Sequence, residues 1–217
     1  MGCFAAFPAL KMARSFCESR EDAVVMVICL ELCTLHFQKS TVADSLISAS
    51  VFADGAAGAI INNKPGSQKA SLKLENFATS VIEQSEEDMA WTIGDTGFDM
   101  VLSTYVPKII ESNLRSSLSP LLESYGVEPK QIRHWAIHPG GRAILDKAEQ
   151  NLGIAPDQLA SSRAILSDYG NMSSATILFV LKHLLDQPMQ HETERVLGMA
   201  FGPGLTVESG LFLKKRG

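Results

Sequence analysis

The chain has 217 residues, of which 46% are hydrophobic and 20% charged, and its formal net charge is −5 at pH 7. This composition excludes a disordered chain, and the acidic balance argues against broad nucleic-acid binding. The longest purely apolar run, AVVMVICL at residues 23–30, is far shorter than the ~20 residues that a membrane-spanning helix needs. We therefore expect a folded protein with a substantial core and no nucleic-acid or membrane partner.

The first predicted element is a helix that begins near Cys3. Phe4, Phe7 and Phe16 recur at helical spacing, and the polar run at 18–22 ends the pattern. Unpaired N–H groups and the macrodipole at a helix N-terminus favour a thiolate and lower the pKa of a thiol placed there. Cys3 is therefore a candidate nucleophile, and the alternative is a buried thiol in a core helix.

Strand and helix patterns alternate along the rest of the chain. They predict a buried strand at 23–32, two strands around an Asp-Gly turn at 49–63, a strand at 69–79, and strands around a turn at 94–97 within 88–102. A helix at 103–126, a strand at 132–138, helices at 141–153 and 173–187, and two strands joined across Gly-Pro-Gly at 195–215 follow. This mixture predicts an α/β fold with layers of helix on sheet. Residues 62–70 are the only linker candidate.

The other cysteines are Cys17, Cys29 and Cys33, and none of them makes a C-x-x-C pair. Cys29 and Cys33 lie in an apolar run, which is typical of small core residues. No His and Cys cluster has the spacing of a zinc site, so we expect no bound metal. The N-terminal segment lacks a charged region ahead of its apolar part, which argues against a secretory signal. These features favour a reduced, cytoplasmic setting.

Two polar motifs stand beside predicted elements in the second half of the chain. His138 ends the predicted strand at 132–138 and is followed by Pro-Gly-Gly. It belongs either to an ordinary turn or to a pocket into which the strand end aims it. Asn171 precedes the apolar helix at 173–187. It either caps that helix or points its carboxamide into a cavity as a hydrogen-bond donor.

A cysteine at a helix start, a histidine after a strand and an asparagine before a helix together suit thioester chemistry. The thiolate attacks an acyl-CoA, and the histidine pairs with that thiolate. N–H donors from the histidine and the asparagine stabilise the oxyanion of the enolate that remains when a malonyl unit loses carbon dioxide. The predicted catalytic residues are therefore Cys3, His138 and Asn171.

Five segments carry a resemblance to a known family: GCFAAFPALKMA (2–13), FADGAAGAII (52–61), WAIHPGGRAILD (135–146), SDYGNMSSATILFVL (167–181) and AFGPGLTVE (200–208). In this order they resemble the type III polyketide synthases, the chalcone and stilbene synthase family of the thiolase fold. The resemblance implies a layered αβαβα fold. Residues 1–63 are then expected to form the end of the N-terminal half with the nucleophile helix, and residues 64–217 the complete C-terminal half.

The resemblance also implies roles for individual residues. Cys3, His138 and Asn171 match the acyl-accepting nucleophile, the catalytic histidine and the catalytic asparagine of the family. Phe52 matches the first gatekeeper phenylalanine, which helps to orient the malonyl group. Met100 falls where the second gatekeeper is usually phenylalanine, which suggests a softer and wider mouth because Met is flexible.

Further substrate-binding positions come from the same resemblance. Ala143 lies where the family's backbone touches CoA, and Ser173 lies close to the nucleophile. Cys33 and His36 match pocket-lining positions; His36 is bulkier than the usual threonine, and its alternative is a core residue. The loop that holds Phe201, Gly202 and Pro203 has alanine at position 200 where the family has glycine, which changes the predicted shape of the cyclisation pocket.

The implied activity is decarboxylative condensation of malonyl-CoA onto a cysteine-bound acyl starter, followed by cyclisation, in a homodimer that uses CoA thioesters as substrates and no other cofactor. A ketoacyl synthase III-like single condensation is one alternative. In the family, a large segment with the basic residues that grip the CoA phosphates precedes the nucleophile, whereas here Cys3 is the third residue. A fragment, a truncated gene model or an inactive homologue is therefore the other alternative.

Overall fold

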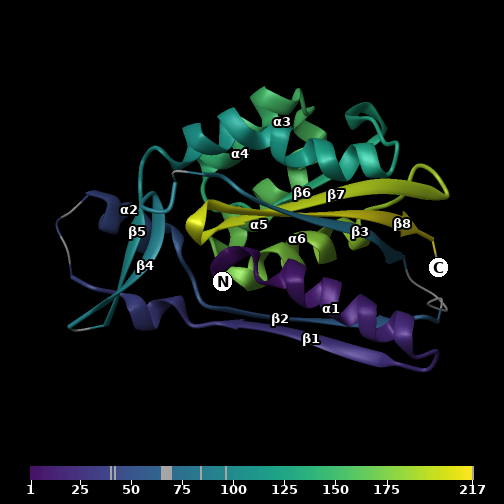
Figure 1. Cartoon of the computed structure of the whole chain (residues 1–217), viewed down its shortest axis with the longest axis horizontal. Helices are drawn as coiled ribbons and strands as arrows, with labels where there is room; N and C mark the ends of the chain where they lie inside the picture. Colours follow the sequence, from purple (N-terminus) through teal and green to yellow (C-terminus); the bar gives the residue numbers. More distant parts are fainter. Residues whose placement is uncertain (40, 42, 65–69, 84, 96, 217) are drawn as a thin grey trace.

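The computed structural model consists of four stacked layers (Figure 1). It describes all residues except 40, 42, 65–69, 84, 96 and 217, and no side chain at 43, 44 and 97–100. Helices α3 (Val106–Ser124) and α4 (Arg142–Leu152) cover one face of a four-stranded sheet. Helices α1 (Ala6–Ser19), α5 (Ala160–Tyr169) and α6 (Ser174–Asp186) lie on the other face. A two-stranded antiparallel sheet of β1 (Val24–Glu31) and β2 (Gly55–Asn62) forms the fourth layer, against α1 and α6.

The larger sheet has the order β3-β8-β7-β6, with bounds Ser71–Val81 (β3), Thr206–Lys215 (β8), Thr193–Gly202 (β7) and His134–Ile137 (β6). Its three long strands are antiparallel, whereas β6 runs parallel to β7 with Ile137 opposite Met199. Because β6 and β7 are parallel, their carboxyl ends lie at the same edge of the sheet. The residues that follow these two strands therefore meet there.

Aromatic packing joins the sheet to the middle helix layer. The rings of Phe7 on α1, Phe77 on β3 and Phe212 on β8 pack at centroid distances of 5.8 to 6.5 Å. Gly198 on β7 leaves room for this cluster, since a Cβ there would lie 2.8 Å from the Phe212 ring. Burial of these side chains orients α1, and with it the turn that carries Cys3.

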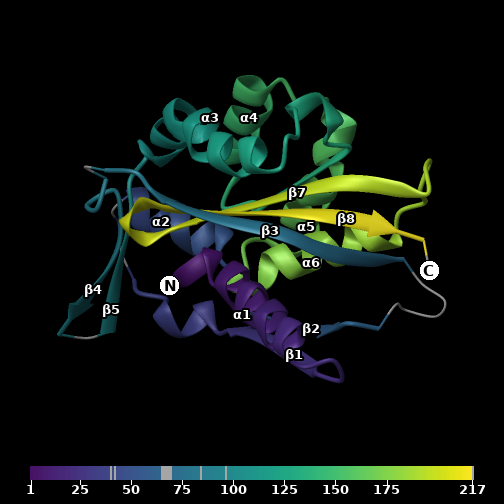
Figure 2. The same ribbon diagram turned by 45° about the vertical axis from the view of Figure 1, so that its right-hand side comes forward.

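A second group of elements lies at one end of the molecule (Figure 2). The hairpin of β4 (Met89–Gly94) and β5 (Gly97–Leu102) and helix α2 (Ala43–Val51) lie there. Short 3-10 turns complete the described structure, at Gly2–Phe4 (η1), Cys33–His36 (η2), Pro129–Gln131 (η3), Pro156–Leu159 (η4) and Pro203–Leu205 (η5).

Most predicted elements are confirmed, two predictions are wrong, and one helix is missing from the predictions. Residues 49–51 belong to helix α2 rather than to a strand, and the Asp-Gly pair only precedes β2. Helix α5 has the sequence ASSRAILSDY, in which half of the residues are polar, and it packs against α6, a contact that the sequence does not show. The strand at 23–32 is not buried on both faces: its alternate side chains are exposed.

Two further points concern the linker and the membrane. The predicted linker at 62–70 includes residues 65–69, which lie outside the described residues. Among the helices that the structure describes, none is both long and apolar enough to cross a bilayer.

Candidate active site

Cys3 lies in the η1 turn, which leads into α1 and is stabilised by a hydrogen bond from the Ala5 N–H to the Gly2 carbonyl (3.0 Å). Gly2 adopts a φ of +67°, a conformation that favours glycine. The end of β7 comes close to this turn at Gly202, where a Cβ would overlap the Phe4 ring and lie 3.0 Å from the Met1 carbonyl oxygen. This close approach fixes Cys3 at the sheet edge where β6 and β7 end.

Asn171 is held by backbone bonds from both sides. Its N–H donates to the Val51 carbonyl (2.8 Å), and its own carbonyl accepts from the Ala53 N–H (2.9 Å). Its side-chain Oδ1 accepts from the Ser173 N–H at 2.9 Å and lies 3.9 Å from the Cys3 sulfur, whose S–H donates to it. The side chain therefore bonds to the backbone just before α6 and also faces the thiol and the cavity, whereas its role as a donor to a substrate stays a prediction. Since Oδ1 is occupied, the amide nitrogen is the group that remains to donate to a substrate.

His138 follows the last residue of β6 and is fixed by its N–H, which donates to the Met199 carbonyl at 2.7 Å. The side chain is only 1% exposed, and neither ring nitrogen has a hydrogen-bond partner among the described residues. Burial lowers the pKa of His138 from 6.5 to about 3, because the charged ring loses its hydration. A buried ring with two unpartnered nitrogens is suited to a substrate that supplies the missing hydrogen bond.

The pKa of the Cys3 thiol is raised from 9.0 to about 11. Burial is the largest cause, the Ser173 and Asn171 hydrogen bonds oppose it, and the Glu31 carboxylate adds to the increase. The prediction of a lowered thiol pKa is therefore wrong for the free site. The physical reason is that α1 begins only at Ala6, so Cys3 lies before its first turn, and burial dominates.

A small cavity of about 40 Å³ lies over these three residues. Cys3, His138, Asn171, Phe52 and Ser173 line it, together with residues from the β4–β5 hairpin, α4 and the end of β7. A larger hollow of about 990 Å³ adjoins it and shares Gly2, Phe52, Trp91 and Ser173 in its walls. The three predicted catalytic residues thus share one cavity, and Phe52 stands between this cavity and the larger hollow.

Four of the other predicted substrate-binding residues divide between the two spaces. Phe201 and Pro203 line the small cavity, whereas Cys33 and His36 line the larger hollow. His36 is exposed, so it is not a core residue, and its ring lies 4.9 Å from that of Trp91. The thiol of Cys33 has a pKa raised to about 12, first by burial and then by the neighbouring Glu31.

Three predicted positions do not contribute a described side chain to either wall. Gly202 acts through its close contact with Phe4 rather than as part of the lining. Ala143 is exposed on α4 and its predicted backbone contact with CoA stays a prediction, whereas the neighbouring Ile144 lines the cavity. Met100 is paired with Trp91 on the β4–β5 hairpin, but its side chain lies outside the described part of the structure.

Comparison with known proteins identifies the family. The sequence pattern described as "Chalcone and stilbene synthases, N-terminal domain" matches residues 1–65, and the corresponding C-terminal domain matches residues 73–215. The chain belongs to the chalcone and stilbene synthase family.

A curated relative and two crystal structures extend the match. The Bacillus subtilis (strain 168) protein named "Putative chalcone synthase" is 33% identical over 223 residues, which cover 100% of this chain and 61% of the relative. The second match is the 1,3,6,8-tetrahydroxynaphthalene synthase of Streptomyces coelicolor A3(2), a bacterial type III polyketide synthase. It has a TM-score of 0.92 and 30% sequence identity, and the match covers 100% of this chain and 62% of the synthase chain. The type III polyketide synthase domain of Steely1 from Dictyostelium has a TM-score of 0.91 and 30% sequence identity. The match covers 100% of this chain and 61% of the Steely1 domain.

These similarities assign the chain a thiolase-like α/β fold of the type III polyketide synthases. They also show that the chain spans about three fifths of the length of these relatives, 61% of the Bacillus subtilis protein and 62% of the Streptomyces enzyme.

In this chalcone and stilbene synthase family member, the sequence analysis pointed to the β4–β5 hairpin only through Met100 and missed its other contributions to the site. Met89, Trp91 and Leu102 of that hairpin line the small cavity, and Trp91 also lines the larger hollow. Met89 and Trp91 are two residues apart on a strand, so they share a face. Ala90 between them lines the cavity as well, so strand alternation carried no signal for this contact.

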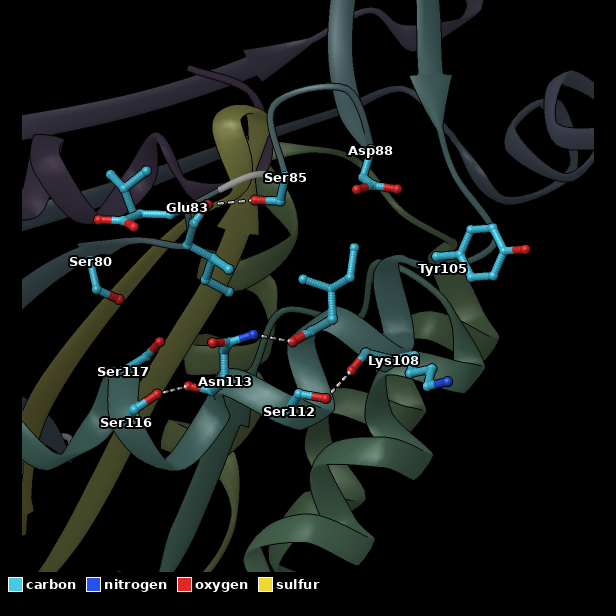
Figure 3. Close-up of a pocket in the computed structure, with 13 residues that line it drawn as sticks. Ser80, Glu83, Ser85, Asp88, Tyr105, Lys108, Ser112, Asn113, Ser116 and Ser117 are labelled. Atoms are coloured by element: carbon cyan, nitrogen blue, oxygen red, sulfur yellow. Dashed lines mark hydrogen bonds between the residues drawn. The ribbon is translucent and has the colours of Figure 1, made fainter.

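A third hollow, of about 910 Å³, lies between the end of β3 and helix α3 (Figure 3). Its labelled lining is polar, with serines on α3 and acidic residues near the end of β3. Several of these hydroxyls are already bonded within their own helix, such as Ser112 to the Lys108 carbonyl (3.0 Å). No lining residue of this hollow is shared with the Cys3 cavity, so we assign the candidate site to the latter.

Proposed function

We propose that this protein acts in a type III polyketide synthase reaction, in which malonyl-CoA is decarboxylated and condensed onto an acyl group carried by Cys3. The single observation that supports this most directly is the cavity whose wall combines the Cys3 thiol with His138 and Asn171. A nucleophile beside two N–H donors is the arrangement that acyl transfer through a thioester requires.

In the first step the Cys3 sulfur attacks the carbonyl carbon of an acyl-CoA. His138 accepts the thiol proton, and the resulting imidazolium and thiolate stabilise each other, which offsets the burial that disfavours each charge alone. The sulfur–carbon bond to CoA then breaks, CoA leaves as its thiol with that proton, and the acyl group stays on Cys3.

In the second step malonyl-CoA loses carbon dioxide, and the electron pair of the broken C–C bond forms an enolate. N–H groups of His138 and Asn171 donate to the enolate oxygen. The enolate carbon attacks the acyl carbonyl on Cys3, a new C–C bond forms, and the Cys3 thiolate is released. This chemistry uses the CoA thioesters alone and draws on no metal or redox cofactor.

The larger hollow supports chain extension in preference to a single condensation. Its volume of about 990 Å³ is at the upper end of ordinary ligand pockets, whereas the cavity at Cys3 has room only for the reacting groups. Phe52 and Trp91 border both spaces. A growing chain would therefore pass these two rings, with the paired His36 and Trp91 rings forming part of the wall that limits its length.

The proposal includes a homodimer in a cytoplasmic setting. Support for self-association comes from α1, where Met12 is 60% and Phe16 53% exposed. Support for a reducing setting comes from Cys3, Cys17, Cys29 and Cys33, which are all free thiols.

The test is incubation of the chain with a labelled acyl-CoA and malonyl-CoA, followed by peptide mapping and product mass spectrometry. We expect the acyl label on the Cys3 peptide, no label in Cys3→Ala, and an unchanged label in the matched control Cys17→Ala. Asn171→Ala should retain acylation but lose decarboxylation by about 100-fold or more. A label on Cys33, or decarboxylation that is indifferent to Asn171, would remove the mechanism. A labelled chain that never extends would favour the inactive homologue.

A further inference from the structure

The hollow between the end of β3 and helix α3 takes no part in the proposed reaction, and we call it the β3–α3 hollow (Figure 3). Its volume is about 910 Å³, and its wall comes from residues within 80–88 and 105–117. All of these residues lie within 73–215, which match the C-terminal domain of the family. The hollow therefore belongs to one domain, and it shares no residue with the Cys3 cavity.

Strand β3 and helix α3 place two serines opposite each other across this hollow. The side-chain amide of Asn76 on β3 donates to the hydroxyl of Ser124 on α3 (3.4 Å), and the end of β3 lies beside the first half of α3. Four residues along a strand span about 13 Å and seven residues along a helix about 11 Å, so Ser80 lies opposite Ser117. Both serines line the hollow, which agrees with this register.

The described residues leave both of these hydroxyls without a partner. The Ser80 hydroxyl oxygen is buried and has no hydrogen bond, and Ser117 is only 8% exposed. Unlike Ser112 and Ser116, Ser117 does not donate to a carbonyl of its own helix (Figure 3). Buried polar groups without partners are rare in native structures, because each of them costs free energy. Two of them at one place indicate that a bound molecule supplies the missing hydrogen bonds.

The other polar side chains of α3 in this wall offer acceptors. Ser112 and Ser116 donate their hydroxyl hydrogens to the carbonyls of Lys108 and Asn113, at 3.0 and 2.9 Å. The Asn113 amide nitrogen donates to the Ile109 carbonyl at 2.9 Å. Each of these three side chains donates within the helix and keeps an oxygen that can accept from a ligand.

The loop at 83–88 adds negative charge to the wall. Glu83 and Asp88 line the hollow, on either side of Ser85 in Figure 3, and neither of them makes an ion pair with a described residue. Lys108 is the one cationic side chain among the described residues of the wall. The wall thus contains two carboxylates against one ammonium group, and more acceptors than donors. Its complement is a positively charged ligand that is rich in N–H groups.

The arrangement also limits the shape of that ligand. A metal ion needs several ligands around one point, and the described residues contain no group of three His, Cys, Asp or Glu side chains that could hold one. The two carboxylates lie apart, and the serine pair occupies a third position (Figure 3). This spacing fits an elongated ligand with separated charges. The Tyr105 ring, which is 68% exposed, adds an aromatic face that an ammonium group can contact.

We infer that the β3–α3 hollow binds a linear polyamine, with ammonium groups at Glu83 and Asp88 and a further N–H group at the hydroxyls of Ser80 and Ser117. The side chains that define this site are not used in the proposed reaction, so the inference does not depend on that reaction.

The experiment is a calorimetric titration of the 217-residue chain with spermidine. We expect saturable one-to-one binding, which octanediol, a neutral chain of similar length, does not show. Glu83→Gln and Asp88→Asn should each weaken binding about tenfold and Ser80→Ala about fivefold, because each variant removes a hydrogen bond to the bound ligand.

Two matched controls separate the site from its surroundings. Glu87→Gln removes an exposed charge from the same loop but not from the wall, and its effect should stay below about twofold because salt screens such a charge. Ser119→Ala removes an α3 hydroxyl that donates to the Arg115 carbonyl and lies outside the wall, and binding should not change. Circular dichroism checks that each variant folds.

Three results would overturn the inference. The first is the absence of saturable binding, and the second is binding that Glu83→Gln and Asp88→Asn weaken no more than Glu87→Gln does. The third is binding of octanediol or sucrose as tight as that of spermidine, which would assign the hollow to a neutral hydroxylated ligand. Cys3→Ala should bind spermidine like the native chain, so failure of this site is distinguishable from failure of the proposed reaction.

Discussion

Raising the pH from 8 to 10 should accelerate alkylation of Cys3 by iodoacetamide about 100-fold, because only the thiolate reacts. The structure raises the pKa of this thiol from 9.0 to about 11, mainly through burial. At pH 8 the thiolate fraction is then about one in a thousand, against about one in ten for a thiol whose pKa is 9.0. The difference corresponds to about 3 kcal/mol of lost thiolate stabilisation.

The assay follows the mass of the Cys3 peptide over time at a series of pH values, in the substrate-free chain. Ser173→Ala removes a hydrogen bond that lowers the thiol pKa, so Cys3 should react still more slowly in that variant. Cys33 is the internal comparison, since its pKa is raised to about 12 and its alkylation should be slower than that of Cys3. A rate that levels off below pH 9 would refute the reasoning, because it would show that a thiolate–imidazolium pair with His138 already exists in the free site.

Three further predictions test burial, close packing and pocket shape. Burial lowers the pKa of His138 from 6.5 to about 3. As the pH falls, His138 therefore gains a proton in the unfolded state before it does so in the folded state. The free energy of unfolding should drop by about 2 kcal/mol between pH 6.5 and 5 for this reason. Urea unfolding should show this loss in the native chain and in exposed His191→Gln, and a smaller loss in His138→Gln, where burial still lowers the pKa of His134. Gly202→Ala places a Cβ against Phe4 and should cost about 2 kcal/mol in thermal unfolding, whereas Gly141→Ala, where no atom lies within 4 Å, should cost little. Trp91→Ala should enlarge the hollow next to the Cys3 cavity and shift the products toward longer chains, which mass spectrometry measures. Unchanged product masses would contradict the place of Trp91 in the wall of that hollow.

The sequence by itself determined the elements whose signals are local. Apolar spacing predicted the helices that became α1, α3, α4 and α6, since periodicity is a property of neighbouring residues. The turn residues after His138 and the helix start after Asn171 were likewise visible as short motifs. Together with the resemblance, these motifs were enough to select Cys3, His138 and Asn171, which the structure then brings to one cavity.

Only the tertiary structure decided the properties that depend on distant contacts. Cys3 and Asn171 are 168 positions apart in the chain, and the raised pKa of the thiol follows from what the fold packs around it. Trp91 reaches the site because its hairpin folds over it, which the strand pattern could not show. The strand at 23–32 was predicted to be buried, but one face of β1 is exposed. Sequence patterns record which side chains avoid water, whereas burial, charge stabilisation and pocket shape arise only when remote segments pack together.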